Sequence, residues 1–192
     1  MGSDLQRIAR FLADADLPDE LVLSLYGTLA GAMTRGTFVS GEAATVLPLR
    51  GERVGSMYMP PNGGTGSAFL ETLRVALVHE RRDSRGGSVG LDLAFATPRA
   101  WLADGKRIHV LRAPTSFGPV SYLIRRRGDV VRVVVELPPA PSVRLRLRLP
   151  SSRQIDRIAM AGRQLAFDRD SGTIDLPAGD SRTLRLVARL SH

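Results

Sequence analysis

The segment Val143-Arg144-Leu145-Arg146-Leu147-Arg148-Leu149 decides the fold of the C-terminal half of the chain. Apolar and basic residues alternate along it without a break. Side chains of a β-strand point alternately to opposite faces of the sheet, so this period of two is typical of a half-buried strand. We therefore expect a strand at 143–149 with leucines and valine in a core and arginines in water.

Similar short runs recur around this segment at the spacing of a β-sandwich. The predicted strands are 91–96, 107–112, 120–126, 130–137, 143–149, 154–159, 164–167, 173–176 and 183–190. Hairpin turn signals occur at Gly128-Asp129, Ala161-Gly162 and Ser171-Gly172. No helical pattern separates the strands, so the sequence predicts an antiparallel sandwich over 81–192, entered through a polar linker at 80–90. We expect Trp101 to pin its first connection to the core.

The first 80 residues have a helical pattern instead. Helices are predicted at 4–13, 18–33 and 67–79, with Pro18 in a first turn and Ser67 as an N-cap. The expected buried stripes are Leu5, Ile8 and Leu12 in the first helix, Leu21, Val22, Leu25, Tyr26, Leu29 and Met33 in the second, and Leu70, Leu73 and Leu77 in the third. Gly27 and Gly31 would let another helix approach closely.

A long loop, 36–66, separates the second and third predicted helices. Glycine and proline recur in it, and no period is sustained. Loops of this length are usually functional, or anchored on a neighbouring structure. The fold class is therefore α+β, with a helical segment 1–80 followed by the sandwich. Helix-like sequence begins directly after Met1-Gly2-Ser3, so we expect that the N-terminus was cut from a longer protein.

Charge and composition limit the possible functions. Residues 1–80 hold six arginines and nine acids, a net charge of −3, whereas residues 81–192 hold 21 basic and ten acidic residues, a net charge of +11. The chain has no cysteine and three scattered histidines, so we expect no metal site and no cofactor, and cysteine content assigns no compartment. No stretch approaches the roughly 20 apolar residues of a membrane span. The excess arginines are either solvated residues on outward strand faces or an anion-binding surface.

Few motifs point to chemistry. The run Asn62-Gly63-Gly64-Thr65-Gly66-Ser67 leads into a helix and could hold an anion, but it lacks the lysine of a P-loop and reads better as a plain turn. Ser40 lacks the preceding glycine of a nucleophile elbow. Glu42 is a carboxylate on the glycine-rich loop, and glycoside hydrolysis uses such groups in pairs. No partner for it is evident, so a surface role stays open. Tyr58 could offer a ring face to a sugar.

Five segments together resemble the C-terminal end of bacterial six-hairpin glycosidase-like proteins, in which an (α/α)6 barrel precedes a small β-sandwich. They are Gly36-Thr37-Phe38-Val39-Ser40-Gly41-Glu42, Met57-Tyr58-Met59-Pro60-Pro61-Asn62, Phe69-Leu70-Glu71-Thr72-Leu73-Arg74, Pro98-Arg99-Ala100-Trp101-Leu102 and Ala113-Pro114-Thr115-Ser116-Phe117-Gly118. The resemblance covers nearly the whole chain. It implies that 4–79 are the last barrel helices and that Glu42, Tyr58 and Asn62 contact a saccharide.

The first hypothesis for function is a C-terminal region of a carbohydrate-active, glycoside hydrolase-like protein, without a complete catalytic pair of its own. Its partners would be a carbohydrate and the rest of the barrel. The alternative is a binding module whose basic sandwich recognises a polyanion, either an acidic polysaccharide or nucleic acid. Aromatic residues form only 5% of the chain, which argues against nucleic acid. A third hypothesis is an interaction module that docks its helical stripe on a partner.

Overall fold

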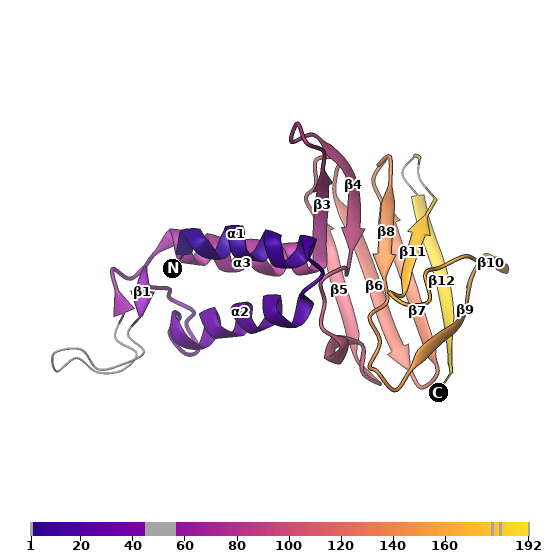
Figure 1. Ribbon diagram of the computed structural model, residues 1–192, viewed down its shortest axis with the longest axis horizontal. Coiled ribbons are helices and arrows are strands. Elements are labelled where there is room, and N and C mark those ends of the chain that lie inside the picture. Colours follow the sequence, from indigo (N-terminus) through magenta and orange to yellow (C-terminus); the bar gives the residue numbers. More distant parts are fainter. Residues whose placement is uncertain (1, 45–56, 178, 181, 192) are drawn as a thin grey trace. The chain divides into compact units, whose positions relative to one another are not determined.

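The computed structural model describes residues 2–44, 57–177, 179–180 and 182–191 (Figure 1). The chain forms two compact units, Met1–Ala76 and Leu77–His192. Three helices near the N-terminus are followed by two sheets rich in antiparallel pairs, so the α+β class with a β-sandwich is confirmed. None of the described helices is long and apolar enough to cross a membrane.

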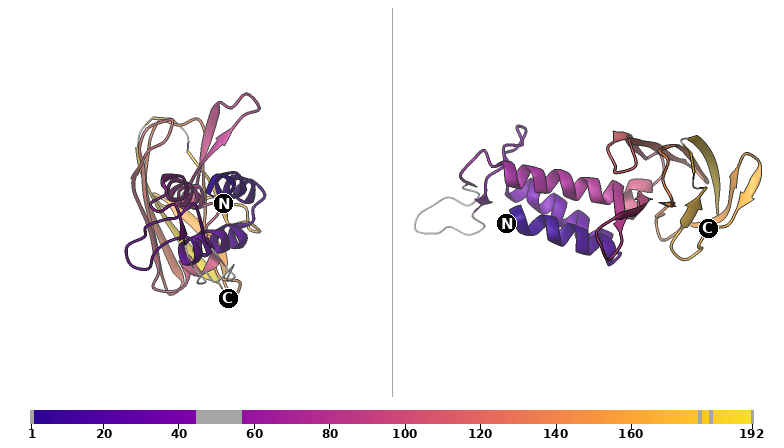
Figure 2. Two further views of the ribbon diagram at one scale, coloured as in Figure 1. Left: turned by 90° about the vertical axis from the view of Figure 1, so that its left-hand side faces the viewer. Right: turned by 90° about the horizontal axis from the view of Figure 1, so that it is seen from above.

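The helical unit contains α1 (Gly2–Asp14), α2 (Pro18–Gly31) and α3 (Gly63–Leu77), which run side by side (Figure 2). Pro18 stands in the first turn of α2, and Asp19 and Glu20 follow it, where their charge suits the helix dipole. An ion pair joins α1 to α3: the Arg10 Nε donates to the Glu71 Oε1 at 2.9 Å.

The buried faces of the helices differ from the predicted stripes. Leu12, Leu21, Val22, Leu25 and Met33 are buried as expected. Ile8, Tyr26 and Leu70 are exposed to 46%, 51% and 65%, so those three assignments are wrong. The buried face of α3 consists of small or β-branched residues: Thr65, Ala68, Thr72, Val75 and Ala76. Small side chains let helices approach closely, whereas a stripe chosen by hydrophobicity alone favours leucines.

No described helix makes the close approach predicted at Gly27 and Gly31. Among the described residues, no atom lies within 4 Å of the position that a Cβ would occupy at either glycine. Within the described residues, the two glycines therefore face open space, and they weaken α2 because glycine has a low helix propensity.

The long loop is more ordered than predicted. Strand β1 (Ala43–Ala44) pairs antiparallel with β2 (Met57–Tyr58), and Met33 and Ser40 form an isolated bridge. Helix α3 begins at Gly63 and not at Ser67, because Asn62 caps it: the Thr65 backbone N–H donates to the Asn62 Oδ1 at 2.9 Å. The sequence did not predict this start, because the glycines of the first turn have a low helix propensity. Residues 45–56 of the predicted loop lie outside the described residues.

The sandwich consists of a six-stranded and a four-stranded sheet, whose strands can be followed in Figure 1. The six-stranded sheet has the order β10-β9-β12-β7-β6-β5 and is antiparallel throughout. Its strands are β5 (Arg107–Ala113), β6 (Val120–Arg127), β7 (Val130–Leu137), β9 (Gln154–Met160), β10 (Arg163–Leu165) and β12 (Arg182–Ser191). These bounds match the predicted strands to within a few residues, and the turns at Gly128 and Gly162 join them as predicted.

The four-stranded sheet has the order β11-β8-β4-β3. Its strands are β3 (Val78–Arg82), β4 (Ser88–Leu93), β8 (Val143–Arg146) and β11 (Thr173–Leu176). Strands β4 and β8 pair in parallel, an exception to the predicted antiparallel order. No helix is needed between them, because the chain passes through β5, β6 and β7 of the other sheet on the way.

The predicted linker 80–90 is wrong, because β3 and β4 form a hairpin across it. The Asp83 Oδ1 closes its turn by accepting hydrogen bonds from the backbone N–H groups of Arg85 at 2.9 Å and Gly87 at 2.8 Å. Helix α3 accordingly ends at Leu77, before the predicted His79. The sequence concealed β3 because it is polar, and polar strands are common at the edge of a sheet, where β3 lies.

Both sheets contribute to one core. The short η1 helix (Arg99–Leu102) carries Trp101, which packs against that core as predicted. In the deciding segment, Val143, Leu145, Leu147 and Leu149 are all buried. The prediction that the arginines of this segment lie in water is wrong: Arg146 is only 6% exposed, and Arg144 and Arg148 are half-buried. The arginines on the outer face of this sheet are therefore largely withdrawn from water.

Candidate functional site

The predicted saccharide-contacting residues lie on two segments that hydrogen bonds hold together. The Asn62 N–H donates to the Ser40 carbonyl at 2.7 Å, and the Ser40 Oγ donates to the Asn62 carbonyl at 2.6 Å. Nearby, Ala43 pairs with Tyr58 in the β1–β2 ladder. Glu42 stands between Ser40 and Ala43, so these bonds bring the backbones of Glu42, Tyr58 and Asn62 to one end of the helical unit, at what we call the 40/62 junction.

Glu42 and Asn62 at this junction differ in exposure and in hydrogen bonding. Glu42 is exposed at a bend directly before β1. Asn62 is half-buried, and its side-chain oxygen is already engaged as the cap of α3. The capped Thr65 amide also makes the glycine run an ordinary loop-to-helix turn. In the described part of the chain, no three His, Asp or Glu side chains gather as a metal site would need.

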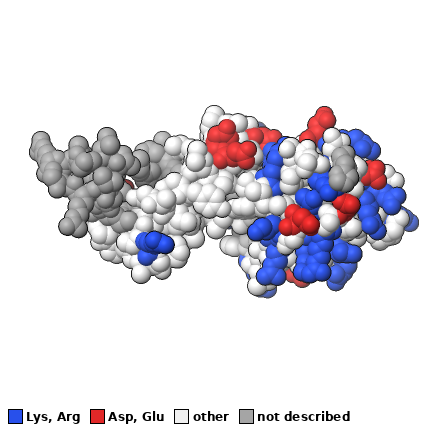
Figure 3. All heavy atoms as spheres, turned by 90° about the horizontal axis from the view of Figure 1, so that it is seen from below, with Lys and Arg blue, Asp and Glu red and all other residues white. Residues whose placement is uncertain are grey.

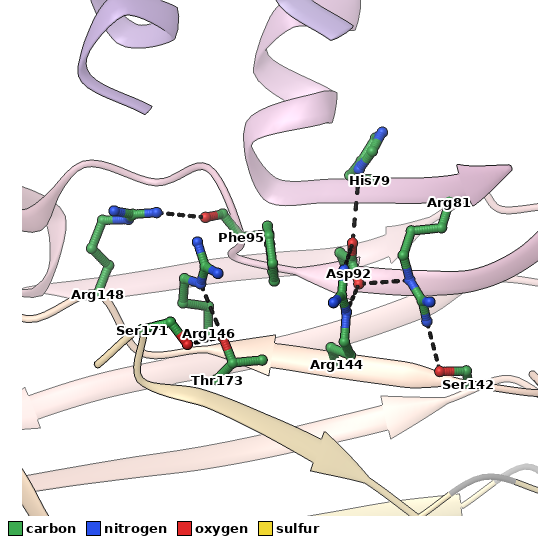
Figure 4. Close-up of polar contacts among 10 residues, drawn as sticks. All are labelled: His79, Arg81, Asp92, Phe95, Ser142, Arg144, Arg146, Arg148, Ser171 and Thr173. Carbon is green, nitrogen blue, oxygen red and sulfur yellow. Dashed lines mark hydrogen bonds and ion pairs between the residues drawn. The ribbon is translucent and has the colours of Figure 1, made fainter. Parts of the chain in front are cut away.

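A second polar site, which the sequence did not reveal, lies on the outer face of the four-stranded sheet (Figure 4). Leu91 and Leu93 of β4 belong to the core, so Asp92 between them points to the other face. The register aligns four residues in one row across the sheet: His79, Asp92, Arg144 and Asp175. Asp92 is 1% exposed. A carboxylate buried so deeply requires charged partners.

Two arginines supply those partners. The Arg144 Nε and Nη2 donate to the two oxygens of Asp92, both at 2.7 Å, in a bidentate pair. The Arg81 Nε lies 3.0 Å from the Asp92 Oδ1, and its Nη2 donates to the Ser142 Oγ at 2.6 Å. The His79 Nδ1 lies 3.9 Å from the Asp92 Oδ2. The side-chain hydrogen bonds to Asp92 raise the pKa of Arg144, so its guanidinium stays protonated.

Further along β8, the arginines surround Phe95. The Arg146 guanidinium lies 3.7 Å from the Phe95 ring centre and that of Arg144 lies 4.7 Å from it, both within the range of cation–π attraction. The Arg146 Nε donates to the Thr173 Oγ1 at 3.0 Å, and the Ser171 Oγ bonds the same oxygen at 2.8 Å. The buried Arg146 is thus held by a ring and a hydroxyl.

An open hollow of about 530 Å³ lies beside these residues, and we call it the β8–β11 hollow. Its walls include two arginines, two carboxylates, two hydroxyls and a phenyl ring: Arg144, Arg146, Asp168, Asp175, Ser171, Thr173 and Phe167. The backbone N–H groups of Ser171 and Asp170 donate to Asp168 and hold the pKa of its carboxyl below the usual value. The hollow thus offers charged donors and acceptors together. It could hold a polar molecule.

The comparisons with known proteins show no family for this chain. No protein-family model matches the chain, and no curated protein matches its sequence. Among solved structures, the chain resembles an α-L-rhamnosidase from Dictyoglumus thermophilum with a TM-score of 0.42 and 8% identity. The likeness covers 73% of this chain and 16% of the rhamnosidase, so the chain spans less than a fifth of the length of that protein.

Proposed function

We propose that this chain is the C-terminal region of a carbohydrate-active, glycoside hydrolase-like protein, in which it supplies structure and saccharide contacts while the catalytic pair belongs to the rest of the parent. The five-segment sequence resemblance supports this proposal, and so does the order of helices, loop and β-sandwich along the chain. The partner of the helical unit would be the remainder of an α/α barrel.

The observation that carries the proposal is that the helices are apolar on more than one face. Leu12, Leu21 and Leu25 are buried, yet large apolar residues elsewhere on the same helices are exposed. Phe11 is exposed to 65%, Leu23 to 72% and Leu70 to 65%. A helix on the surface of a protein has one apolar face, and its other faces are polar. A helix in the interior of a larger bundle is apolar on several faces. The exposed apolar side chains therefore support the proposal that further helices of the parent pack on this helical unit.

A pair of matched leucines tests this. In the longer parent protein, we expect Leu23→Ser to lower the free energy of unfolding by about 2 to 5 kcal/mol, because the leucine would be buried there. Leu111→Ser on β5 is the control, since Leu111 is exposed to 70%, almost as much as Leu23. In the isolated chain, both variants should change stability by less than about 0.5 kcal/mol. Equal small effects of the two variants in the parent would contradict the proposal.

The saccharide contacts are proposed for the 40/62 junction. The exposed carboxylate of Glu42 and the ring of Tyr58 are residue types that bind sugar hydroxyls and sugar faces, and the backbone bonds support their acting together. Asn62 would contribute its amide nitrogen, because its oxygen caps α3.

Glu42→Gln in the parent is the test of that site, because it keeps the shape of the side chain and removes the charge. A fall in turnover of roughly 100-fold or more would make Glu42 a general acid or base, and would contradict a catalytic pair that lies outside this chain. A loss of about 10-fold would fit a charge-assisted bond to a hydroxyl, worth about 1.5 to 3 kcal/mol. Unchanged kinetics with a large drop in melting temperature would make Glu42 a structural residue.

A further inference from the structure

The outer face of the six-stranded sheet carries arginines directly opposite one another. Arg107 of β5 pairs in register with Arg125 of β6, and Arg125 pairs with Arg132 of β7. Two residues further along the strands, Arg189 of β12 pairs with Arg157 of β9. All five are exposed, and each is next in its strand to a core residue: Ile108, Ile124, Val131, Ile158 and Ala188. Figure 3 shows Lys and Arg side chains gathered over the sandwich unit.

This arrangement costs stability. Side chains directly opposite in an antiparallel pair have Cβ atoms about 4.5 to 5.5 Å apart, and like charges there repel. Among the described residues, the side chains of Arg107, Arg125 and Arg132 form no hydrogen bond or ion pair. Two described acids occupy outward positions on these strands. Glu136 lies two rows away from the Arg125–Arg132 pair, opposite Ser121 and Thr183, and Asp156 directly precedes Arg157. The described part of the chain therefore does not neutralise this arginine row.

We propose that the row Arg107, Arg125 and Arg132, with Arg157 and Arg189 beside it, binds a linear anionic polysaccharide. Neighbouring strands lie about 4.8 Å apart, so the row presents three fixed cations over roughly 10 Å. A chain of carboxylated sugars crossing the strands would meet these cations one after another and relieve their repulsion. Leu123 and Val134 lie opposite each other in the adjacent row and could receive the apolar faces of sugar rings.

Nucleic acid fits this face less well. The strands of the six-stranded sheet contain one Phe, Tyr or Trp residue, Tyr122, and it points into the core. The exposed imidazole of His109 is the one ring that these strands offer to a base on this face, which is less than a stacking platform needs. Six strands span roughly 24 Å, which is wider than the major groove of about 12 Å, so duplex DNA would be held by its phosphates alone. An anionic polysaccharide needs neither stacking nor a groove.

The test uses the whole chain and sodium polygalacturonate as the probe, with neutral dextran and a random-sequence DNA duplex as comparisons. The variant R107Q/R125Q/R132Q removes the row. The control R35Q/R85Q/R163Q removes the same charge from exposed arginines elsewhere. A third variant, R107K/R125K/R132K, keeps the charge and shows whether binding follows charge at these positions. Affinity is measured by calorimetry between about 50 mM and 200 mM salt, where counterion release makes ionic binding salt-dependent.

We expect polygalacturonate binding that weakens with salt, falls roughly 10-fold or more in the glutamine row variant and less than about 2-fold in the control, and survives in the lysine variant. An equal loss in the control would overturn the proposal, and so would dextran binding as tight as that of polygalacturonate. DNA binding at least as tight, and with the same arginine dependence, would assign the face to nucleic acid instead. None of these outcomes bears on Glu42, because the probe and the variants address the sandwich.

Discussion

The two outer faces of the sandwich carry the same residue type in opposite states. On the four-stranded sheet, Arg144 and Arg146 are held by Asp92, Phe95 and Thr173 and are largely withdrawn from water. On the six-stranded sheet, Arg125 and Arg132 face each other in solvent. The difference is the neighbouring strand: β4 brings an acid into register with Arg144, whereas β6 and β7 bring arginine to arginine. Alternation along one strand therefore fixes which face an arginine occupies but not its environment.

The largest effect that separates the two faces should come from Asp92. Asp92→Asn removes the charge shared by Arg81 and Arg144, and breaking a buried pair in this way typically costs 3 to 5 kcal/mol. We expect about 3 kcal/mol in urea unfolding, because both arginines can turn partly to water. Asp175→Asn is the control: it is exposed in the same cross-strand row and should cost less than about 0.5 kcal/mol. Equal costs for the two variants would show that Asp92 gains nothing from its burial among arginines.

A smaller effect of opposite sign is expected on the six-stranded sheet. Arg125→Glu places an acid between Arg107 and Arg132 and should stabilise the fold by about 0.2 to 1 kcal/mol at low salt, since opposite charges attract across a strand pair. Salt should reduce this gain, because the site is exposed. Arg163→Glu makes the same charge change opposite Met160 and should stabilise less. A loss of stability in Arg125→Glu would mean that the row does not repel itself, and the comparison of the two faces would fail.

Much of the fold could be predicted because period and turn chemistry are local. The strands β7 and β11 have the predicted bounds. The turns at Gly128 and Gly162 lie where the signals Gly128-Asp129 and Ala161-Gly162 predicted them. The hairpin β3–β4 could not be predicted, since β3 is a polar edge strand whose hydrogen bonds come from the partner. The Asp92 site was missed for a related reason. Asp92 and Arg144 are 52 residues apart, and only the parallel register of β4 and β8 brings them together.

The smallest effect concerns Asp168, at the wall of the β8–β11 hollow. Backbone N–H groups of Ser171 and Asp170 lower the pKa of its carboxyl, so its contribution to stability is present above the unfolded pKa of about 3.9 and is lost as the pH falls through the folded value. Wild type and Asp168→Asn should therefore differ slightly at neutral pH and converge once the pH falls below the folded pKa of Asp168. Titration of the Asp168 carboxyl carbon by NMR measures this directly. A midpoint at or above the ordinary value would mean that the backbone N–H groups of the turn do not favour the ionised carboxylate, and that Asp168 adds nothing to the stability of the four-stranded face through its charge.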